Sequence, residues 1–319
     1  MARNNLATSR RIRTMLALAL LVAIATFGRP AAAQQWAPAR FTPIAPPAIT
    51  AKTAYVLDAT AGAALFALDP DEPRAPASLT KIVTALVVLD HAALDEPVQI
   101  QQSDVVDENQ SRVDLLPGDV LTVRDLLYGL LIPSGNDAAL ALARHVGKNL
   151  PPVDSGSSND AFVAEMNRTA AALGATHTHF VNAVGLDADG HVSSAHDMAI
   201  LTASAMMNPV FADIISTVNT VLPSALKPGG YAIHTTNDLL VSGEVEGGKT
   251  GTEVKAGGCL VTVSHTSGNL IVSVVLGSDM TADESGYAGG ARFTDVRAML
   301  AALPQHYVWI DPAAPDVIP

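Results

Sequence analysis

Residues 78–88, Ser-Leu-Thr-Lys-Ile-Val-Thr-Ala-Leu-Val-Val, decide the fold of this chain. From Ser78 onward apolar residues recur at helical spacing, and no glycine or proline occurs before Pro97. Nearly every position after Lys81 is apolar, so we expect a central helix that is buried on most sides. Ser78 opens this helix and Lys81 lies one turn further on, which places both side chains on one helix face.

The pattern on either side of this helix changes from strands to helices and back to strands. Residues 54–58 and 63–68 are two short apolar runs around a glycine-containing turn, which predicts a β-hairpin. Residues 78–216 are mainly helical in pattern. After residue 218 we expect strands at 245–252, 259–266 and 270–276, followed by an amphipathic helix at 288–303.

This order of elements predicts an α/β fold of the α+β type. We expect one antiparallel sheet of about five strands flanked by helices, with the mainly helical block as a long insertion between strands. Residues 51–303 would form a single catalytic domain. Two proline-rich segments flank it, and we interpret 34–50 as an extended linker and 304–319 as a tail.

The first 33 residues carry the pattern of a secretory signal peptide. Four arginines and no acids precede the apolar run Met15–Phe27. Ala31-Ala-Ala33 then supplies a small-residue cleavage site. A membrane anchor is the alternative, but 13 apolar residues are short for a span of about 20. We therefore expect cleavage before Gln34 and export to the periplasm or another extracytoplasmic space. The general and the twin-arginine routes both stay open.

The composition excludes several function classes. The chain of 319 residues is 49% hydrophobic and 16% charged, which excludes a disordered protein. Only 4% aromatic residues and a net charge of −12 argue against a nucleic-acid partner. Loss of the expected signal peptide removes five arginines and no acids, leaving 14 basic and 31 acidic residues, a net of −17. The single Cys259 excludes an intrachain disulfide framework and a cysteine-rich zinc site.

Three short motifs follow one another along the chain: Ser-Leu-Thr-Lys at 78–81, Ser-Gly-Asn at 134–136 and Lys-Thr-Gly at 249–251. Each is weak alone, because Ser-x-x-Lys recurs at 224–227 and Ser-Gly-Asn at 267–269. Context separates the copies, since Pro-Gly-Gly follows the second lysine and the second Ser-Gly-Asn lies in a predicted hairpin turn. The ordered trio favours a nucleophilic serine site over a set of caps, turns and a snorkelling lysine.

The first two motifs contain the groups that serine chemistry needs. A serine hydroxyl requires an adjacent base, and Lys81 among apolar neighbours would have a lowered pKa and could accept the proton of Ser78. Ser134 can pass a proton to the leaving amine. Asn136 offers both a donor and an acceptor to a substrate amide. The predicted catalytic residues are therefore Ser78, Lys81 and Ser134, with no metal and no cofactor.

The third motif contains groups suited to substrate binding. Lys249 supplies a cation for a substrate carboxylate, and Thr250 adds a hydroxyl. Gly251 lets a backbone approach closely, and an edge strand there could pair with an extended substrate. The backbone N–H of Thr252 would complete an oxyanion hole beside that of Ser78. The predicted substrate-binding residues are Asn136, Lys249, Thr250, Gly251 and Thr252.

These stretches resemble a known family. Five stretches are similar to the motif regions of D-alanyl-D-alanine carboxypeptidases, the low-molecular-mass penicillin-binding proteins of peptidase family S11: Asp71–Lys81, Leu131–Ala138, Thr178–Asn182, Gly185-Leu186 and Gly248–Gly251. The resemblance covers roughly residues 52–303 and implies the serine β-lactamase/transpeptidase-like fold. It also implies acylation of Ser78 by peptidoglycan peptides ending in D-Ala-D-Ala, loss of the terminal D-Ala, hydrolysis, and covalent inhibition by β-lactams.

Two departures keep alternative functions open. Many family members carry a C-terminal β-domain and an amphipathic anchor, whereas this chain ends about 16 residues after the last predicted helix, so we expect no C-terminal membrane anchor. Short family members include D,D-endopeptidases, which cut peptidoglycan crosslinks. A β-lactamase is a further alternative, although residues 150–190 contain no Glu-x-x-Leu-Asn and Glu165 has the wrong spacing. A catalytically silent penicillin-binding wall protein is another alternative, although all catalytic groups are present.

Several cysteine, arginine, histidine and aspartate residues fall outside the three motifs. We expect Cys259 to be a small buried side chain, and Arg292 and Arg297 to lie on a solvated helix face. A run of histidines and aspartates between residues 177 and 196 could hold a metal, but we interpret it as a structural loop. Its members are His177, His179, Asp187, Asp189, His191 and His196.

Overall fold

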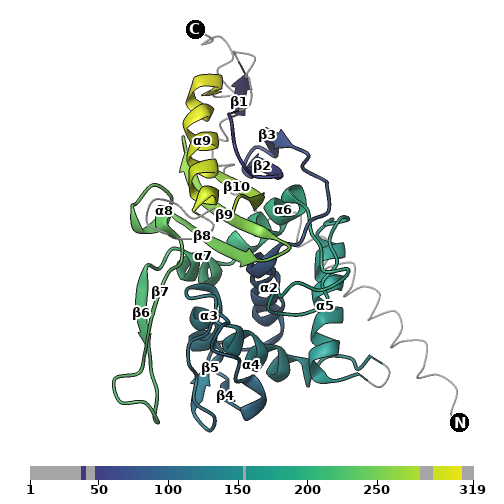
Figure 1. Ribbon diagram of the computed structural model, residues 1–319, viewed down its shortest axis with the longest axis vertical. Coiled ribbons are helices and arrows are strands. Elements are labelled where there is room, and N and C mark those ends of the chain that lie inside the picture. The colour runs from purple at the N-terminus through teal and green to yellow at the C-terminus, as the bar shows by residue number, and fades with distance from the viewer. Residues whose placement is uncertain (1–36, 41–46, 154–155, 281–289, 311–319) are drawn as a thin grey trace, which may run out of the picture.

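A five-stranded antiparallel sheet crosses the molecule in the order β3-β2-β10-β9-β8 (Figure 1). The structure is a computed structural model that describes residues 37–40, 47–153, 156–280 and 290–310. The observed sheet confirms the predicted fold class. The predicted signal peptide, residues 1–33, lies outside the described residues. The strands are β2 (Thr53–Asp58), β3 (Ala63–Leu68), β8 (Gly247–Glu253), β9 (Gly257–Thr266) and β10 (Asn269–Ser278).

Three local hairpins and one long-range pairing build this sheet, and β8 joins it as a hairpin with β9. Strands β2 and β3 form the predicted first hairpin, with Val56 opposite Phe66. Strands β9 and β10 form the second, and the left-handed φ values of Ser267 (51°) and Gly268 (82°) fit its tight turn. Strand β10 then pairs with β2 from the far end of the chain. The helical block is therefore an insertion between strands, as predicted.

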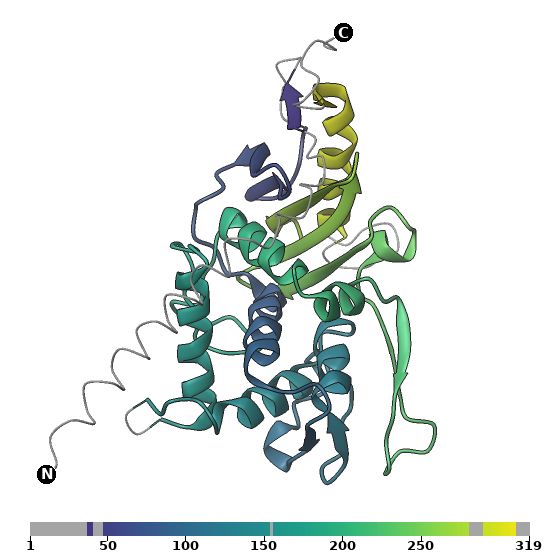
Figure 2. The ribbon, with the colours of Figure 1, turned by 180° about the vertical axis from the view of Figure 1, so that it is seen from behind.

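The sheet has an apolar core on each face because side chains alternate along its strands. On β2, Tyr55 and Leu57 join the larger core with the helical block, whereas Ala54 and Val56 join the smaller core with α9 (Ala291–His306). The two views in Figures 1 and 2 show α9 on one side of the sheet and the helical block beyond the other. Each face of the sheet is thus covered.

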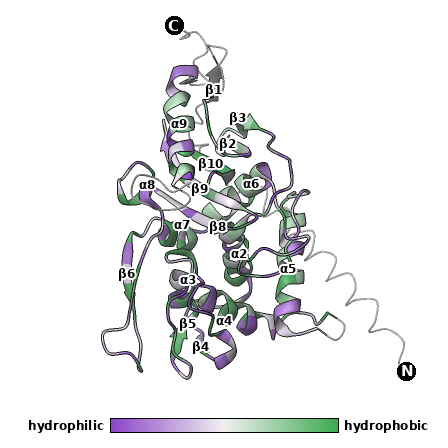
Figure 3. Cartoon of the chain, viewed as in Figure 1, coloured by the Kyte–Doolittle hydropathy of each residue, from purple (hydrophilic) through white to green (hydrophobic). Residues whose placement is uncertain are grey.

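Helix α2 (Lys81–His91) is the central helix of the block. It contacts α3, α4, α5 and α6, and its residues from Lys81 to Val88 are all buried. Figure 3 shows hydrophobic colouring along α2 and a mixed pattern on α9. The helices around α2 are α3 (Val123–Leu131), α4 (Asn136–Gly147), α5 (Ser158–Ala172) and α6 (Ala195–Met206).

The starts of these helices follow capping rules, with one difference from prediction at Ser78. Thr122 and Asp125 form a capping box at the start of α3. Gly135 is the N-cap of α4. A 3₁₀ helix, η1 (Ala77–Thr80), precedes α2, so Ser78 lies in this tight turn instead of in the α-helix. The remaining helical elements are η2 (Gln102–Asp104), α7 (Pro209–Ile215) and α8 (Asp238–Val241).

The two proline-rich flanks contain regular structure that composition did not predict. Strand β1 (Ala37–Arg40), inside the expected linker, pairs antiparallel with β11 (Tyr307–Ile310), inside the expected tail. Helix α9 continues through Pro304 to His306, three residues beyond the predicted end. Trp309 of β11 is buried in the smaller core, and its Nε1 donates to Asp58 Oδ2 at 2.8 Å. The rest of the expected tail, 311–319, lies outside the described residues.

Two further hairpins extend from the helical block. Strand β4 (Pro97–Gln99) pairs with β5 (Val120–Thr122), and β6 (Asn219–Leu222) pairs with β7 (Tyr231–His234). Within the described ranges, no single helix is both long and apolar enough to span a bilayer. By length and composition, α6 and α7 meet that test only as a pair, and they are bent by 113° at their junction.

Candidate active site

Lys81 is the centre of a buried hydrogen-bond cluster where η1 meets α2. Its Nζ lies 2.8 Å from Ser78 Oγ, 2.7 Å from Asn136 Oδ1 and 2.6 Å from the Val184 carbonyl oxygen. A charged ammonium donates to all three acceptors. A neutral amine has two N–H bonds and a lone pair, so it can donate to Asn136 and Val184 and accept the hydroxyl proton of Ser78. The geometry therefore suits Lys81 as the base for Ser78.

The environment of Lys81 favours its neutral form. Its side chain is fully buried, and burial lowers its pKa from 10.5 to about 7. The negative charges of Glu253 and Asp137 oppose this shift and keep the pKa from falling further. A substantial fraction of Lys81 is therefore uncharged near neutral pH, as a proton acceptor requires.

The turn that presents Val184 to Lys81 depends on an asparagine. Asn182 Oδ1 accepts from the backbone N–H of Val184 at 3.2 Å and from that of Gly185 at 2.7 Å. Gly185 has φ 89°, and a Cβ placed there would lie 2.1 Å from the carbonyl oxygen of Ala77. This turn therefore packs directly against the residue before Ser78. The residue type and position of Asn182 in the sequence do not by themselves indicate this role.

The second motif lies in the loop between α3 and α4. Ser134 is 4% exposed and adopts a left-handed backbone conformation with φ 66°. Asn136 is the first residue of α4, and its Nδ2 donates to Gln110 Oε1 at 2.8 Å. Ser134, Asn136 and Gln110 line the same cavity as Ser78. The structure thus brings the predicted catalytic residues together.

Strand β8 presents the third motif at the edge of the sheet. A Cβ at Gly251 would lie 3.0 Å from the backbone nitrogen of Ser78, so β8 runs directly past η1. Lys249 is 2% exposed, and its Nζ donates to the Thr250 carbonyl at 2.8 Å. Burial, Lys81 and Arg292 together hold the Lys249 pKa well below its ordinary value. Thr250 shares a short hydroxyl hydrogen bond with Thr236.

Arg292 contradicts its predicted position on a solvated helix face. Arg292 is only 1% exposed. Its Nη1 donates to the Gly251 carbonyl at 3.0 Å and to the Thr252 hydroxyl. The guanidinium is therefore a buried cation near Lys249, and its charge contributes to lowering the pKa of that lysine. Arg297, one turn further along α9, is exposed as predicted and pairs with Glu244.

Most of the predicted site residues line one cavity of about 700 Å³, whereas Lys81 and Lys249 are buried behind its wall. Ser78, Ser134 and Asn136 lie on its wall with Thr250, Gly251 and Thr252. Glu253 also lines it, and burial together with Asp187 raises the pKa of that carboxyl. Sequence reasoning missed Glu253, Gln110 and Arg292, because nothing in their local patterns marks them as facing a cavity.

Three other candidate residues of the sequence lie outside this cavity and have structural surroundings: Cys259, His191 and Glu165. Cys259 is fully buried, as predicted, and burial raises its thiol pKa to about 11. His191 is buried, contacts Thr80 Oγ1 at 2.8 Å, and has its pKa lowered to about 4, mainly by burial. Glu165 on α5 pairs with His91 and Arg168 in a separate groove between α2, α5 and α6.

The fold and the site together define a class. The DD-transpeptidase of Streptomyces K15 superposes with a TM-score of 0.73 at 32% identity, over 82% of this chain and all of that one. A penicillin-binding protein homolog from Mycobacterium tuberculosis superposes with a TM-score of 0.72 at 34% identity, over 85% of this chain and 98% of that one. This chain is a serine peptidase with the architecture of the penicillin-binding proteins.

Sequence comparisons give the family. The D-alanyl-D-alanine carboxypeptidase family model, Peptidase S11, matches residues 40–280. A D-alanyl-D-alanine carboxypeptidase of Streptomyces strain K15 is 33% identical over 84% of this chain and 92% of its own length. DacB2 of Mycobacterium tuberculosis, also named D-alanyl-D-alanine carboxypeptidase, is 40% identical over 63% of this chain and 66% of its own length. The chain belongs to the D-alanyl-D-alanine carboxypeptidase family.

Proposed function

We propose that this protein is an exported serine D,D-carboxypeptidase. It removes the terminal D-Ala from peptidoglycan stem peptides through an acyl-enzyme on Ser78. The observation that carries the proposal is the 2.8 Å contact between Ser78 Oγ and Lys81 Nζ, made by a buried lysine with a pKa of about 7. The family and the names of its relatives supply the substrate class.

Acylation follows from the contacts of Lys81. The neutral amine takes the proton of Ser78 as Oγ attacks the carbonyl carbon of the penultimate D-Ala. The resulting oxyanion would lie between the backbone N–H groups of Ser78 and Thr252. Ser134 passes to the amine of the terminal D-Ala the proton that Lys81 took from Ser78, and the amine leaves as the C–N bond breaks. A water molecule then adds to the acyl carbon, and Lys81 takes its proton and returns it to Ser78 Oγ as the ester bond breaks.

Substrate recognition rests on two buried basic side chains. A free C-terminal carboxylate would enter beside Lys249 and Arg292, where it restores the charged form of Lys249 by Coulomb attraction. The free edge of β8 can pair with an extended peptide backbone, and Asn136 can bond its amide. The whole pocket therefore suits a short peptide that ends in a carboxylate.

β-Lactams would react with the same groups. Their strained amide takes the place of the D-Ala-D-Ala bond, and their carboxylate takes the place of the C-terminal one. Ser78 opens the ring to form a covalent ester. Because the leaving amine stays tethered, it blocks the approach of water, and the ester should last.

Two alternative functions differ from a carboxypeptidase in the amine that leaves or in the acceptor of the acyl group. A D,D-endopeptidase would release a crosslinked peptide instead of free D-Ala by the same steps. The names of the relatives also point to transfer of the acyl group to an amine. The solved K15 structure is named DD-transpeptidase, whereas the K15 sequence relative is named D-alanyl-D-alanine carboxypeptidase. Both alternatives use the same acyl-enzyme and differ only in what leaves or what accepts.

The remaining alternatives have less support. A class A β-lactamase needs a glutamate that activates the deacylating water. Glu165 faces His91 and Arg168 in a different groove, so it does not serve Ser78. A silent binding protein would not need Lys81 in hydrogen-bond contact with the serine. Export itself rests on the signal-peptide pattern of residues 1–33.

Mass spectrometry of muropeptides incubated with the protein tests this proposal. Conversion of pentapeptides to tetrapeptides with release of D-Ala is the expected result, and Ser78→Ala should abolish it. Loss of crosslinked dimers would instead identify an endopeptidase. Product formation with an added amine acceptor would identify a transpeptidase. No change in any muropeptide would overturn the proposed activity.

A further inference from the structure

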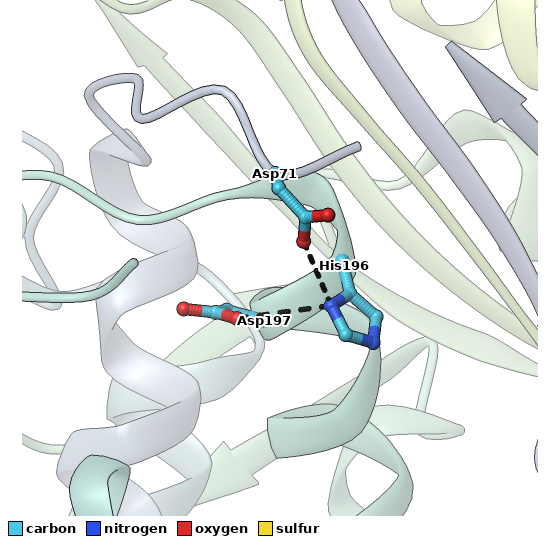
Figure 4. A group of neighbouring side chains, drawn as sticks. All are labelled: Asp71, His196 and Asp197. Carbon is cyan, nitrogen blue, oxygen red and sulfur yellow. Dashed lines mark hydrogen bonds and ion pairs between the residues drawn. The ribbon is translucent and has the colours of Figure 1, made fainter. Parts of the chain in front are cut away.

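Four side-chain atoms from three chain segments converge beside the loop that leads to Ser78. They are Asp71 Oδ1, His177 Nδ1, His196 Nδ1 and Asp197 Oδ1. Figure 4 shows the imidazole of His196 directed toward the carboxylates of Asp71 and Asp197. The ligand atoms of these three residues all lie within 4.8 Å of one another.

Asp197 is the most buried member of the cluster, and one of its carboxylate oxygens has no hydrogen-bond partner. The residue is 1% exposed and lies in the first turn of α6. Its Oδ2 accepts from the His177 backbone N–H and from Thr178 Oγ1, both at 2.7 Å. Its Oδ1 is buried and has no hydrogen-bond partner. That oxygen faces the two imidazoles at 3.8 Å and 4.0 Å, too far for hydrogen bonds.

Distances within the cluster match the spacing of ligands around a small divalent cation. Zinc binds imidazole nitrogen and carboxylate oxygen at about 2.0–2.2 Å, which puts tetrahedral neighbours about 3.3 Å apart. Asp71 Oδ1 lies 2.9 Å from His196 Nδ1 and 3.7 Å from His177 Nδ1. Together with the two Asp197 distances, these values bracket the tetrahedral spacing for four of the six ligand pairs. Asp71, His196 and Asp197 form the mutually close group, and His177 would complete the ligand set by a side-chain shift toward them.

The charges also suit a dication. Within the described part of the chain, the ion-pair partners of Asp71 and Asp197 are these two histidines alone. The nearby Glu72 is already paired with Arg74 at 2.7 Å. Two carboxylates and two neutral imidazoles would neutralise one divalent cation, and this donor set suits zinc.

We propose that Asp71, His177, His196 and Asp197 form a structural zinc site. The metal would tie together three segments that are distant in sequence. One is the 69–76 loop, which a backbone hydrogen bond from His196 to Pro70 at 2.9 Å already fixes to α6. The Asp71 and His177 segments continue to Ser78 and Val184 respectively, so the site braces both sides of the Lys81 cluster without touching it.

Zinc titration of the purified full chain, without a histidine tag, tests this proposal. A chromophoric chelator in competition reports affinity, elemental analysis after desalting reports stoichiometry, and thermal unfolding reports stabilisation. We expect one zinc per chain and, at a hundredfold excess over Kd, a Tm increase of about 5–10 °C. His196→Ala and Asp71→Asn change partly exposed side chains and should each weaken binding about 100-fold.

His265→Ala is the matched control. His265 is an exposed histidine paired with Glu246 at 2.6 Å, outside the cluster, so its loss should leave zinc affinity and the Tm increase unchanged. Equal zinc binding by the parent, His196→Ala and Asp71→Asn would show an adventitious site and overturn the proposal. Absence of zinc binding would show that the cluster is an ion-pair network only, which overturns it equally.

Discussion

Arg292 Nη1 lies 3.0 Å from the Gly251 carbonyl oxygen, so the last helix of the chain reaches into the third motif. This contact places the guanidinium on the cavity wall and near Lys249, where a substrate carboxylate would enter. Arg292 belongs to a helix that otherwise covers the far face of the sheet. The binding site thus depends on a residue outside all three motifs.

Arg292→Ala should weaken recognition of the C-terminal carboxylate. A hydrogen bond to a charged group contributes about 1.5–3 kcal/mol, so kcat/KM for a D-Ala-D-Ala peptide should fall about 10- to 100-fold. For the same peptide with a C-terminal carboxamide, kcat/KM should fall much less. Arg297→Ala, on the exposed face of the same helix, is the control and should leave both substrates unaffected. Equal losses with carboxylate and carboxamide would contradict this role.

Acylation should depend on the protonation of Lys81. Only the neutral amine accepts the serine proton, so the rate of acylation by a penicillin should rise with pH up to the pKa of about 7 and then level off. Glu253→Gln removes a negative charge that raises this pKa, so the inflection should move to lower pH. Stopped-flow acylation between pH 5 and 9 measures both profiles. A rate that is flat, or that falls through pH 7, would contradict Lys81 as the base.

Gly185→Ala should disrupt the turn behind Ser78. The new Cβ would lie 2.1 Å from the Ala77 carbonyl oxygen, and φ is left-handed as well. Denaturant unfolding should show that the free energy of unfolding falls by more than about 3 kcal/mol. Gly174→Ala has a similar φ of 84° and nothing within 4 Å, so it isolates backbone strain at about 1–2 kcal/mol. Equal losses for the two variants would rule out the proposed close contact.

Glu165→Gln should leave the lifetime of the penicillin ester unchanged. Glu165 contacts His91 and Arg168 and lies in a different groove from Ser78, so it has no route to the deacylating water. Weakening those ion pairs should reduce stability slightly. Decay of the adduct, followed by intact-protein mass, measures the lifetime. A tenfold longer lifetime in the variant would reveal a β-lactamase-like role for Glu165.

The elements that sequence predicted best are those whose signal is local. The β2–β3 hairpin, the β9–β10 hairpin and the burial of α2 follow from periodicity and turn residues within about twenty positions. The trio of motifs also has a local signal, and the structure brings its members to one cavity. Contacts such as Lys81 with Asn136, across 55 positions, required the fold to be known.

The differences between prediction and structure have tertiary causes. Arg292 has the composition of a surface helix residue, and only the crossing of α9 over β8 buries it. Strands β1 and β11 lie in proline-rich sequence. They form because they pair with each other and because Trp309 packs in the smaller core. Ser78 occupies a 3₁₀ turn because Ala77, at φ 49°, bends the chain immediately before it. Local pattern holds no signal for any of these.

The most direct test of the central claim is the identity of the acylated residue. The protein is incubated with benzylpenicillin, its intact mass is measured, and the modified peptide is sequenced by tandem mass spectrometry. The account predicts one penicillin per chain, attached to Ser78, and no adduct with Ser78→Ala. Labelling of Ser78→Ala at the parent rate, or attachment to any other residue, would contradict it.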